Sequence, residues 1–362
     1  MELKLDNTKT YAIALEGGGA KGSYQIGVWQ ALEEAGIKFN AVSGTSVGSM
    51  NGAMMAMGDL QNAIDQWSSI KMSKVLDVDD NEMEKLMHLD IGLNNLSGLA
   101  GISRQVVDII KNRGFDISPL RGWLNEVIDV KKIMKSDVEL YITTVSLSDK
   151  KELEIRVKDL APDEVCDMLI ASSYLPAFRL EPLGGKYYAD GGFQDSLPIH
   201  VLIENGYKDI ITIRLHGVGI ERRVRVPEDV TITNIEPSAE LGSILNFVSE
   251  QSVQNLKIGY CDAMRVLFGL SGRKYYIERT LTDKEALDYL IEAEQEAHVG
   301  ASLREICEKE IPRLARFLGQ RAGSYYDIYL AALENEAAEL KIDPYSIMSD
   351  KALMDAISAQ KQ

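Results

Sequence analysis

The sequence predicts an α/β fold in which a mostly parallel central sheet is flanked by helices, with a helical C-terminal region after it. A short apolar run, residues 11–15, leads into a glycine cluster and then a stretch with helical spacing. A second apolar run that ends at Val42 leads into a sharp turn and another helical stretch. Strand, turn and helix repeated in this order are typical of parallel sheets. After residues 231–235 helical spacing continues to the end of the chain.

The remaining elements follow from the same patterns. In the first helix Ile26, Trp29 and Leu32 recur at helical spacing, and Gly36 is a suitable stop. Alternating apolar residues predict two further strands joined as a hairpin, and Pro162 suits the first turn of a helix. The elements expected are helices at 24–35, 162–171 and 198–205, and strands at 138–147, 152–157, 210–215 and 231–235.

A length of 362 residues suggests one large domain and a smaller one. We expect the first domain to cover residues 10–240, with residues 72–135 as a cap or insertion because their pattern is loose. Residues 241–362 form the expected helical C-terminal region. Its last part, residues 281–362, holds 9 Lys and Arg against 16 Asp and Glu.

Composition limits the partners and the compartment. The chain has 39 Lys and Arg against 55 Asp and Glu, and this net charge of -16 excludes nucleic acid as an expected partner. Only a local patch could then bring the protein transiently to a membrane or micelle surface. Three widely spaced cysteines favour a reducing compartment. The sequence shows neither a signal peptide nor an apolar stretch long enough to span a membrane, so we expect a cytoplasmic protein. A protein secreted without a signal peptide would show the same features.

A strand, a Gly-x-Ser-x-Gly turn and a helix follow one another at Gly44, Ser46 and Gly48. A serine nucleophile requires this arrangement, because a sharp turn lifts its hydroxyl above the sheet while small neighbours avoid clashes. The alternative is a turn without chemistry. The helix after the turn carries Met50, Met54 and Met57, which suit core packing, with an adaptable lipid pocket as the second possibility.

The upstream cluster Gly17, Gly18, Gly19, Ala20, Lys21 and Gly22 allows several interpretations. It does not fit a Walker A loop, since Lys21 precedes the last glycine. It matches a dinucleotide fingerprint, but the next strand lacks the acidic residue that would bind a ribose. It also suits an oxyanion hole, in which backbone N–H groups, a helix N-terminus and Lys21 supply positive potential. We favour the oxyanion hole.

A serine nucleophile needs a base. Asp190, followed by Gly191 and Gly192, lies after a short apolar run where a loop could place its carboxylate over the sheet, although Asp-Gly also forms ordinary turns. His200 or His216 could instead complete a Ser, Asp, His order. Neither histidine has a glycine- or proline-rich loop around it, so Asp190 is the preferred base.

Four segments together resemble the patatin-like phospholipase family. They are EGGGAKGSYQIGVWQALEEAG, GTSVGSMNGA, ASSYLPAF and DGG, in that order over about residues 10–215. The resemblance implies a three-layer α/β fold, a catalytic domain within residues 10–240 and a Ser-Asp dyad without histidine. It implies that Ser46 is the nucleophile and Asp190 its base, that Gly17, Gly18 and Gly19 form the oxyanion hole, and that Lys21, Gly22, Gly44, Gly48, Gly191 and Gly192 support them.

The resemblance also implies a substrate class. We expect a hydrolase of acyl esters in phospholipids, lysophospholipids or neutral glycerolipids, acting without metal or cofactor, since no metal-ligand pattern is visible. An acyltransferase, a general carboxylesterase or a catalytically weak lipid-binding module remain alternatives. Two departures from the family pattern, Asp195 in place of asparagine and Tyr174 in place of a smaller residue, could reshape the acyl pocket. The oligomeric state is not predicted.

Overall fold

The computed structural model describes residues 2–77, 114–176, 178–321 and 323–361. These residues form two compact units, residues 5–263 and residues 1–4 with 264–362, and helix α10 (Ser249–Phe268) runs across the boundary. The division falls later in the chain than the residue 240 expected from the sequence. Much of the expected cap, residues 78–113, lies outside the described residues.

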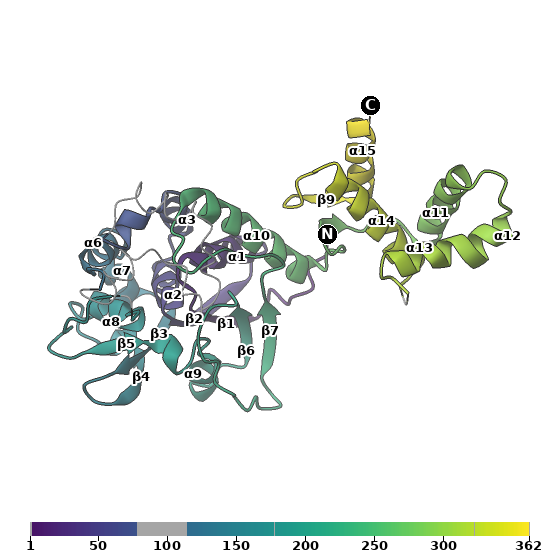
Figure 1. The fold of residues 1–362 in the computed structure, drawn as a ribbon. Helices are drawn as coiled ribbons and strands as arrows, with labels where there is room; N and C mark the ends of the chain where they lie inside the picture. Colours follow the sequence, from purple (N-terminus) through teal and green to yellow (C-terminus); the bar gives the residue numbers. More distant parts are fainter. Residues whose placement is uncertain (1, 78–113, 177, 322, 362) are drawn as a thin grey trace. The chain divides into compact units, whose positions relative to one another are not determined.

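The first unit is built around a seven-stranded sheet in the order β4-β3-β2-β1-β6-β7, with β5 paired to β3 (Figure 1). Strands β1, β2, β3, β6 and β7 run parallel, whereas β4 and β5 are antiparallel to β3. This confirms the expected mostly parallel sheet. The strands are β1 (Thr10–Leu15), β2 (Lys38–Thr45), β3 (Glu139–Ser146), β4 (Lys151–Arg156), β5 (Tyr188–Asp190), β6 (Asp209–Ile213) and β7 (Thr231–Ile235).

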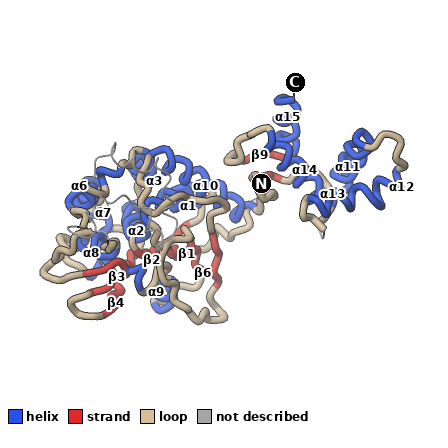
Figure 2. Tube along the Cα trace, in the orientation of Figure 1, coloured by secondary structure: helices blue, strands red, loops and turns tan. Residues whose placement is uncertain are grey.

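Helices lie on both faces of this sheet (Figure 2). The side chains of the central strands alternate between the faces: Ala12 and Ala14 pack with α9, while their neighbours are buried on the other side. The helices are α1 (Ser23–Glu34), α2 (Val47–Met57), α3 (Leu60–Ser68), α6 (Ser118–Val127), α7 (Val130–Lys135), α8 (Val165–Ser172) and α9 (Ile199–Glu204). Single 3-10 turns occupy Gly19–Gly22, Met72–Lys74, Val157–Asp159 and Gly191–Phe193.

Helix α8 begins later than its proline suggests. Residues 162–164 form a turn in which the Glu164 carboxylate accepts a hydrogen bond from the Ala161 N–H, and the helix starts only at Val165. The other expected helices and strands of this unit begin within a few residues of their predicted positions. Local sequence patterns therefore locate these elements well, and one helix starts three residues after the proline that predicted it.

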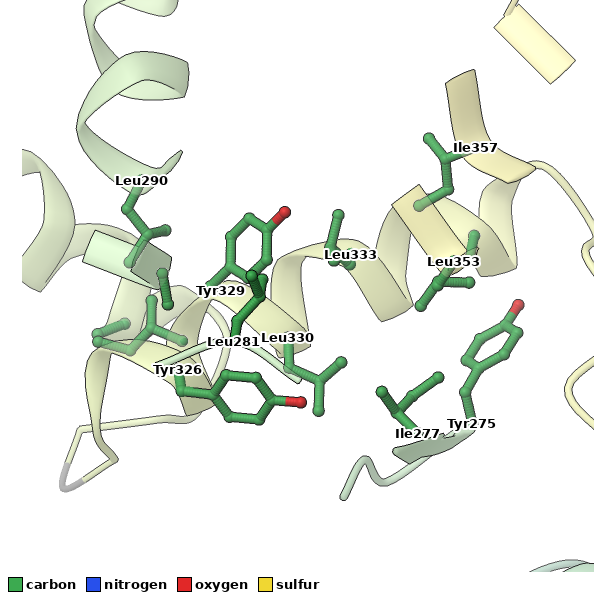
Figure 3. Close-up of a cluster of buried hydrophobic side chains, with 14 of the residues drawn as sticks. Tyr275, Ile277, Leu281, Leu290, Tyr326, Tyr329, Leu330, Leu333, Leu353 and Ile357 are labelled. Carbon is green, nitrogen blue, oxygen red and sulfur yellow. The ribbon is translucent and has the colours of Figure 1, made fainter. Parts of the chain in front are cut away.

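The second unit is mostly helical and has its own core (Figure 3). Tyr326, Tyr329, Leu330 and Leu333 of α14 pack against residues from the other helices, and the Tyr289 and Tyr329 rings stack at 5.4 Å. Its elements are β8 (Tyr276–Glu278), α11 (Asp283–Ala297), α12 (Leu303–Glu305), the π-helical turn Ile306–Glu310, α13 (Ile311–Phe317), α14 (Tyr325–Glu339), β9 (Ile347–Ser349) and α15 (Asp350–Lys361).

Two short parallel strands, β8 and β9, interrupt this helical unit. The sequence did not predict these strands, because three residues are too few to show an alternating pattern. A buried carboxylate stabilises the segment before β8: one oxygen of Glu334 accepts the N–H groups of Arg273, Lys274 and Tyr275. Among the helices of the described ranges, none combines the length and the apolar character needed to cross a bilayer.

Candidate active site

Strand β3 brings two distant parts of the chain together. Thr143 of β3 pairs with Thr45, the last residue of the parallel strand β2. The next residue, Thr144, pairs with Asp190 at the end of the antiparallel strand β5. The two neighbouring strands therefore abut along β3, and Ser46, which follows Thr45, comes next to Asp190.

Ser46 lies in a strained backbone conformation between β2 and α2. Its φ of 56° and ψ of -129° place it in a region that non-glycine residues rarely adopt. Gly44 and Gly48 make this sharp turn possible: a Cβ on Gly44 would lie 2.3 Å from the Gly48 carbonyl oxygen, and one on Gly48 would lie 2.5 Å from that of Leu15. This is the geometry of a nucleophile elbow.

Hydrogen bonds hold the elbow in place. The Ser46 N–H donates to Ser172 Oγ at 2.9 Å, and the Ser172 hydroxyl donates to the Thr143 carbonyl at 2.7 Å. On the other side, the Ser49 hydroxyl donates to the Ser46 carbonyl at 2.6 Å. The strained residue is therefore fixed at both its N–H and its carbonyl, and neither of these contacts uses its hydroxyl.

Asp190 is a buried carboxylate with one oxygen engaged. Its Oδ1 accepts the Gly192 N–H at 2.8 Å, while Oδ2 has no partner of good hydrogen-bond geometry among the described residues. Burial raises the pKa of Asp190 to about 6, against the opposing effects of the Ser46 hydroxyl and the Gly192 N–H. Ser46 is thus close enough to affect the carboxylate. A carboxylate with this pKa is a better general base than an ordinary aspartate.

Gly191 and Gly192 allow the loop after Asp190 to pack tightly. A Cβ on Gly191 would lie 2.5 Å from the Thr143 carbonyl oxygen, so only glycine lets this loop approach β3. A Cβ on Gly192 would lie 3.1 Å from Asp190 Oδ1. The two glycines therefore support the position of the carboxylate.

The glycine turn lies beside the elbow. A Cβ on Gly17 would lie 3.2 Å from Ser46 Cβ. The Gly17 N–H already donates to the Ser196 carbonyl at 2.9 Å. Within the described ranges the N–H groups of Gly18 and Gly19 have no hydrogen-bond acceptor. Of the three glycines expected to form an oxyanion hole, these two have donors to offer.

Lys21 and Gly22 contact other parts of the site. Lys21 Nζ donates to the carbonyls of His216 at 2.9 Å and Leu215 at 3.4 Å, and burial lowers its pKa against the attraction of Glu240 and Glu16. Lys21 thus binds the loop that packs on the glycine turn. A Cβ on Gly22 would lie 2.4 Å from Val47, so this glycine lets α1 begin close to α2.

Sequence reasoning missed the role of Glu16. Its buried carboxylate accepts the N–H groups of Leu215 at 2.6 Å, His216 at 3.2 Å and Gly217 at 3.1 Å. The loop 215–217 is thereby fixed against the glycine turn. The position of this glutamate, directly before three glycines at a strand end, could have drawn attention to it in the sequence. Its partners could not be predicted, because they lie in the loop after β6, which only the fold brings to the glycine turn. The role of Ser172 was not predicted either, because its partners, the Ser46 N–H and the Thr143 carbonyl, are distant in the sequence.

An apolar pocket opens beside Ser46. Its lining is mainly hydrophobic and includes the edge-to-face pair Trp67 and Trp123, whose ring centroids lie 6.4 Å apart. Of the expected methionines, Met50 lines this pocket, whereas Met54 is buried in the core. Met57, the last residue of α2, is partly exposed. The pocket suits an apolar chain attached to the group that Ser46 would attack.

The histidines of the described ranges have other partners. His200 Nε2 lies 2.7 Å from a Glu154 carboxylate oxygen, and His216 is exposed with its ring 3.6 Å from Glu236. Among the described residues, two clusters gather three side chains each that could bind a metal: Glu152, Glu154 and His200, and Glu294, His298 and Glu310. The guanidinium of Arg222 lies within 3.7 Å of every member of the first cluster, and the second cluster is partly exposed. We therefore assign a metal to neither cluster.

Comparisons with known proteins find a matching family model and several similar sequences. The family model described as Patatin-like phospholipase matches residues 13–203, more than half of the chain. The chain is 25% identical over 206 residues to Patatin-like phospholipase domain-containing protein 7 of Rattus norvegicus and 28% identical over 204 residues to protein 6 of Homo sapiens. Each match covers 56% of this chain but only 13% of the relative. Lysophospholipase nte1 of Aspergillus terreus is 50% identical over 48 residues, which are 13% of this chain and 3% of the relative.

Two solved structures are similar over most of the chain. VipD from Legionella pneumophila shares 16% identity with a TM-score of 0.44, and the match covers 97% of this chain and 83% of that one. The type III effector protein ExoU shares 15% identity with a TM-score of 0.35, covering 97% of this chain and 69% of that one.

Proposed function

This chain belongs to the patatin-like phospholipase family, as its motifs indicated, and we propose that it hydrolyses carboxylic esters of lipids through an acyl-enzyme on Ser46 with Asp190 as general base. The observation that carries the proposal is the pairing along β3, which sets the strained Ser46 next to a buried carboxylate. The apolar pocket beside Ser46 supports a lipid acyl chain as the bound group.

The proposed reaction has two steps. Ser46 Oγ attacks the ester carbonyl while Asp190 takes its proton; the ester C–O bond then breaks, and Asp190 gives the proton to the departing alcohol. In the second step Asp190 takes a proton from water, whose oxygen attacks the acyl-enzyme and releases the fatty acid, and the proton returns to Ser46. The pKa of about 6 favours Asp190 as the acceptor in both steps at neutral pH.

The negative oxygen that forms in each step needs hydrogen-bond donors. We propose that the N–H groups of Gly18 and Gly19 supply them, because they lie in the turn beside Ser46 and have no acceptor within the described ranges. Gly17 takes a supporting part, since its N–H is bonded to Ser196. Removal of one such donor costs about 3 to 4 kcal/mol of transition-state stabilisation in a measured case.

For substrate, we propose acyl esters of glycerophospholipids, lysophospholipids or neutral glycerolipids. The protein would bind these lipids at a membrane or micelle surface. The pocket lining supports an acyl chain but does not select a headgroup. An acyltransferase or a general carboxylesterase would use the same dyad. A lipid-binding module of low activity would keep the pocket without the chemistry.

The experiment is labelling of the purified protein with a fluorophosphonate, peptide mapping, and fatty-acid release from a phospholipid panel in the presence of chelator. We expect labelling at Ser46, fatty-acid release, and loss of both in Ser46→Ala. Added glycerol tests acyl transfer, because an acyltransferase forms a glycerol ester in place of free acid. A folded protein that is not labelled favours the lipid-binding module.

A further inference from the structure

A buried polar cluster lies where α9, β4 and the loop after Asp190 meet. His200, in the first turn of α9, has only 3% of its surface exposed. Its Nδ1 lies 2.8 Å from Asp195 Oδ2, and its Nε2 lies 2.7 Å from Glu154 Oε1 and 3.1 Å from Arg222 Nη1. Asp195 is completely buried, and Glu152 completes the set of charged groups that face the ring.

The backbone of Asp195 contacts both halves of the proposed dyad. Its carbonyl accepts the Thr45 hydroxyl at 2.8 Å, directly before Ser46. Its N–H donates to the Gly191 carbonyl at 3.0 Å, directly after Asp190. Whatever holds the side chain of Asp195 in place therefore holds the segment that spaces Ser46 and Asp190.

The Asp195 carboxylate has two kinds of partner. Its Oδ1 accepts the N–H groups of Leu197 at 3.1 Å and Arg222 at 3.4 Å, and its Oδ2 faces His200, so the charge of His200 contributes to how firmly Asp195 is held. When the ring is protonated, Nε2 donates to Glu154, and the positive charge forms an ion pair with Asp195, whose Oδ2 lies 2.8 Å from Nδ1. A neutral ring has one N–H only, and its Nε2 can then accept from Arg222 instead. The buried Asp195 carboxylate would lose the adjacent positive charge.

The surroundings favour the protonated ring. Burial lowers the pKa of His200, but Asp195 and Glu154 raise it by more, so that the net change is upward from the ordinary value. The facing groups are three carboxylates, from Glu152, Glu154 and Asp195, and one cation, Arg222. The ring therefore keeps its proton above the pH at which a free histidine loses it.

We propose that protonated His200 is a positioning residue, which holds the Asp195 segment and through it the spacing of Ser46 and Asp190, and that loss of its proton sets the alkaline limit of activity. This inference rests on the proposed function. It gives a bell-shaped dependence of kcat/KM on pH, whose acid limb follows Asp190, with a pKa of about 6, and whose alkaline limb follows His200. His200 touches neither the substrate nor the reacting atoms in this account.

The test is the profile of kcat/KM against pH on a soluble short-chain ester, with the rate of Ser46→Ala subtracted as background. In the unmodified protein we expect kcat/KM to fall by about tenfold or more on the alkaline side, the scale of a small misplacement of catalytic groups. His200→Asn keeps a side-chain N–H donor but cannot titrate, so its alkaline limb should disappear while its acid limb remains. His298→Asn is the matched control, since His298 also lies between two glutamates but in the other unit, and both limbs should persist.

Asp195→Asn gives a sharper readout. Removal of the carboxylate should lower the pKa of His200 and move the alkaline limb to lower pH by the same amount. NMR titration of the four histidines, with the imidazole carbons labelled, measures the pKa of His200 directly. If His200→Asn does not fold, Asn replacements of the other three histidines assign the His200 signal by elimination.

Three outcomes overturn the inference. One is an alkaline limb that persists in His200→Asn. Another is a His200 pKa that differs from the midpoint of that limb. The third is a folded His200→Asn that is inactive at every pH, because that result would make His200 a catalytic base. Activity that survives in Ser46→Ala would instead contradict the proposed function, and a persistent alkaline limb with an inactive Ser46→Ala would contradict this inference alone.

Discussion

Thr45 and Asp190 pair with consecutive residues of one strand, Thr143 and Thr144, although one belongs to a parallel partner and the other to an antiparallel partner of β3. Residues that are adjacent on β3 thus fix the spacing of two segments that are far apart in the chain. Backbone hydrogen bonds therefore bring Ser46 and Asp190 together, and sheet register sets the distance that the contacts of the Asp195 segment then refine.

The first prediction concerns Asp190 and stability. In the folded protein its pKa is about 6, above the ordinary 3.8, so the folded state binds this proton more tightly than the unfolded state. The stabilisation from this group is present below about pH 4 and is lost as the pH rises through about 6. At pH 8, Asp190→Asn should therefore be inactive but more stable than the unmodified protein by up to about 3 kcal/mol, at roughly 1.4 kcal/mol per pH unit.

Denaturant unfolding of Asp190→Asn at pH 4 and pH 8 measures this difference. Asp149→Asn is a control of opposite sign, since Lys186 and then Ser146 lower the pKa of Asp149 by hydrogen bonding. Its removal should reduce stability at pH 8, with less effect at acid pH. An Asp190→Asn protein that is less stable than the unmodified one at pH 8 would show that the carboxylate is not destabilised by burial.

The second prediction separates two adjacent serines. Ser172 Oγ accepts the Ser46 N–H, so Ser172→Ala leaves a buried donor without a partner and should cost about 1 to 3 kcal/mol. Ser173 Oγ is buried without a hydrogen-bond partner among the described residues, and Ser173→Ala should change stability by less than about 0.5 kcal/mol. Equal losses in the two variants would contradict the role given to Ser172. Fluorophosphonate labelling of Ser46 should also slow more in Ser172→Ala.

The third prediction concerns the glycine turn. Gly19 has a φ of +56°, and a Cβ there would lie 2.1 Å from the Ile244 carbonyl oxygen. Gly58 has a φ of +69° with open space around it. Both Gly→Ala variants should lose about 1 to 2 kcal/mol from backbone strain, and Gly19→Ala should lose more because its Cβ would clash with a backbone carbonyl. Only Gly19→Ala should also lose kcat, by about a hundredfold, as the oxyanion donor moves. A normal kcat in Gly19→Ala would exclude this turn as the oxyanion hole.

The fourth prediction concerns the pocket. Leu175 lines it and is partly exposed, so Leu175→Trp should narrow it without a large loss of stability. We expect kcat/KM for a dodecanoyl ester to fall about tenfold relative to an acetyl ester, as excluded methylene groups lose their contacts. Leu180→Trp, at a residue that is 53% exposed, is the control and should keep the same ratio. A ratio that is unchanged in Leu175→Trp would place the acyl chain elsewhere.

Much of the site could be predicted from short segments. The turn at Gly44, Ser46 and Gly48 and the glycine cluster before α1 are contiguous, and their geometry depends on backbone freedom that the residue types themselves reveal. The central sheet was predictable for a similar reason, since apolar runs next to glycine turns and helical stretches repeat in order. The two strands β8 and β9 were not, because three residues carry too little pattern.

Other features depend on partners far along the chain. Lys21 was expected to add positive potential to the oxyanion hole; the structure adds that its ammonium group donates to the carbonyls of the loop at His216, which the sequence did not indicate. Gly17 was expected to offer its N–H, which Ser196 engages instead. The partners of both residues come from segments about 180 or more positions later, and no local pattern specifies which carbonyl will be nearest.

The sequence by itself therefore determined the α/β class, the family, the sharp turn at Ser46 and the glycine turn beside it, because local backbone geometry and the order of apolar runs follow from residue type. The tertiary structure alone decided that Asp190 lies beside Ser46 and that burial raises the pKa of Asp190. It also decided that Ser172, Glu16 and His200 contact the segments that form the site. These relationships arise from strand register and from the exclusion of water, and both are set by contacts between segments that are distant in the chain.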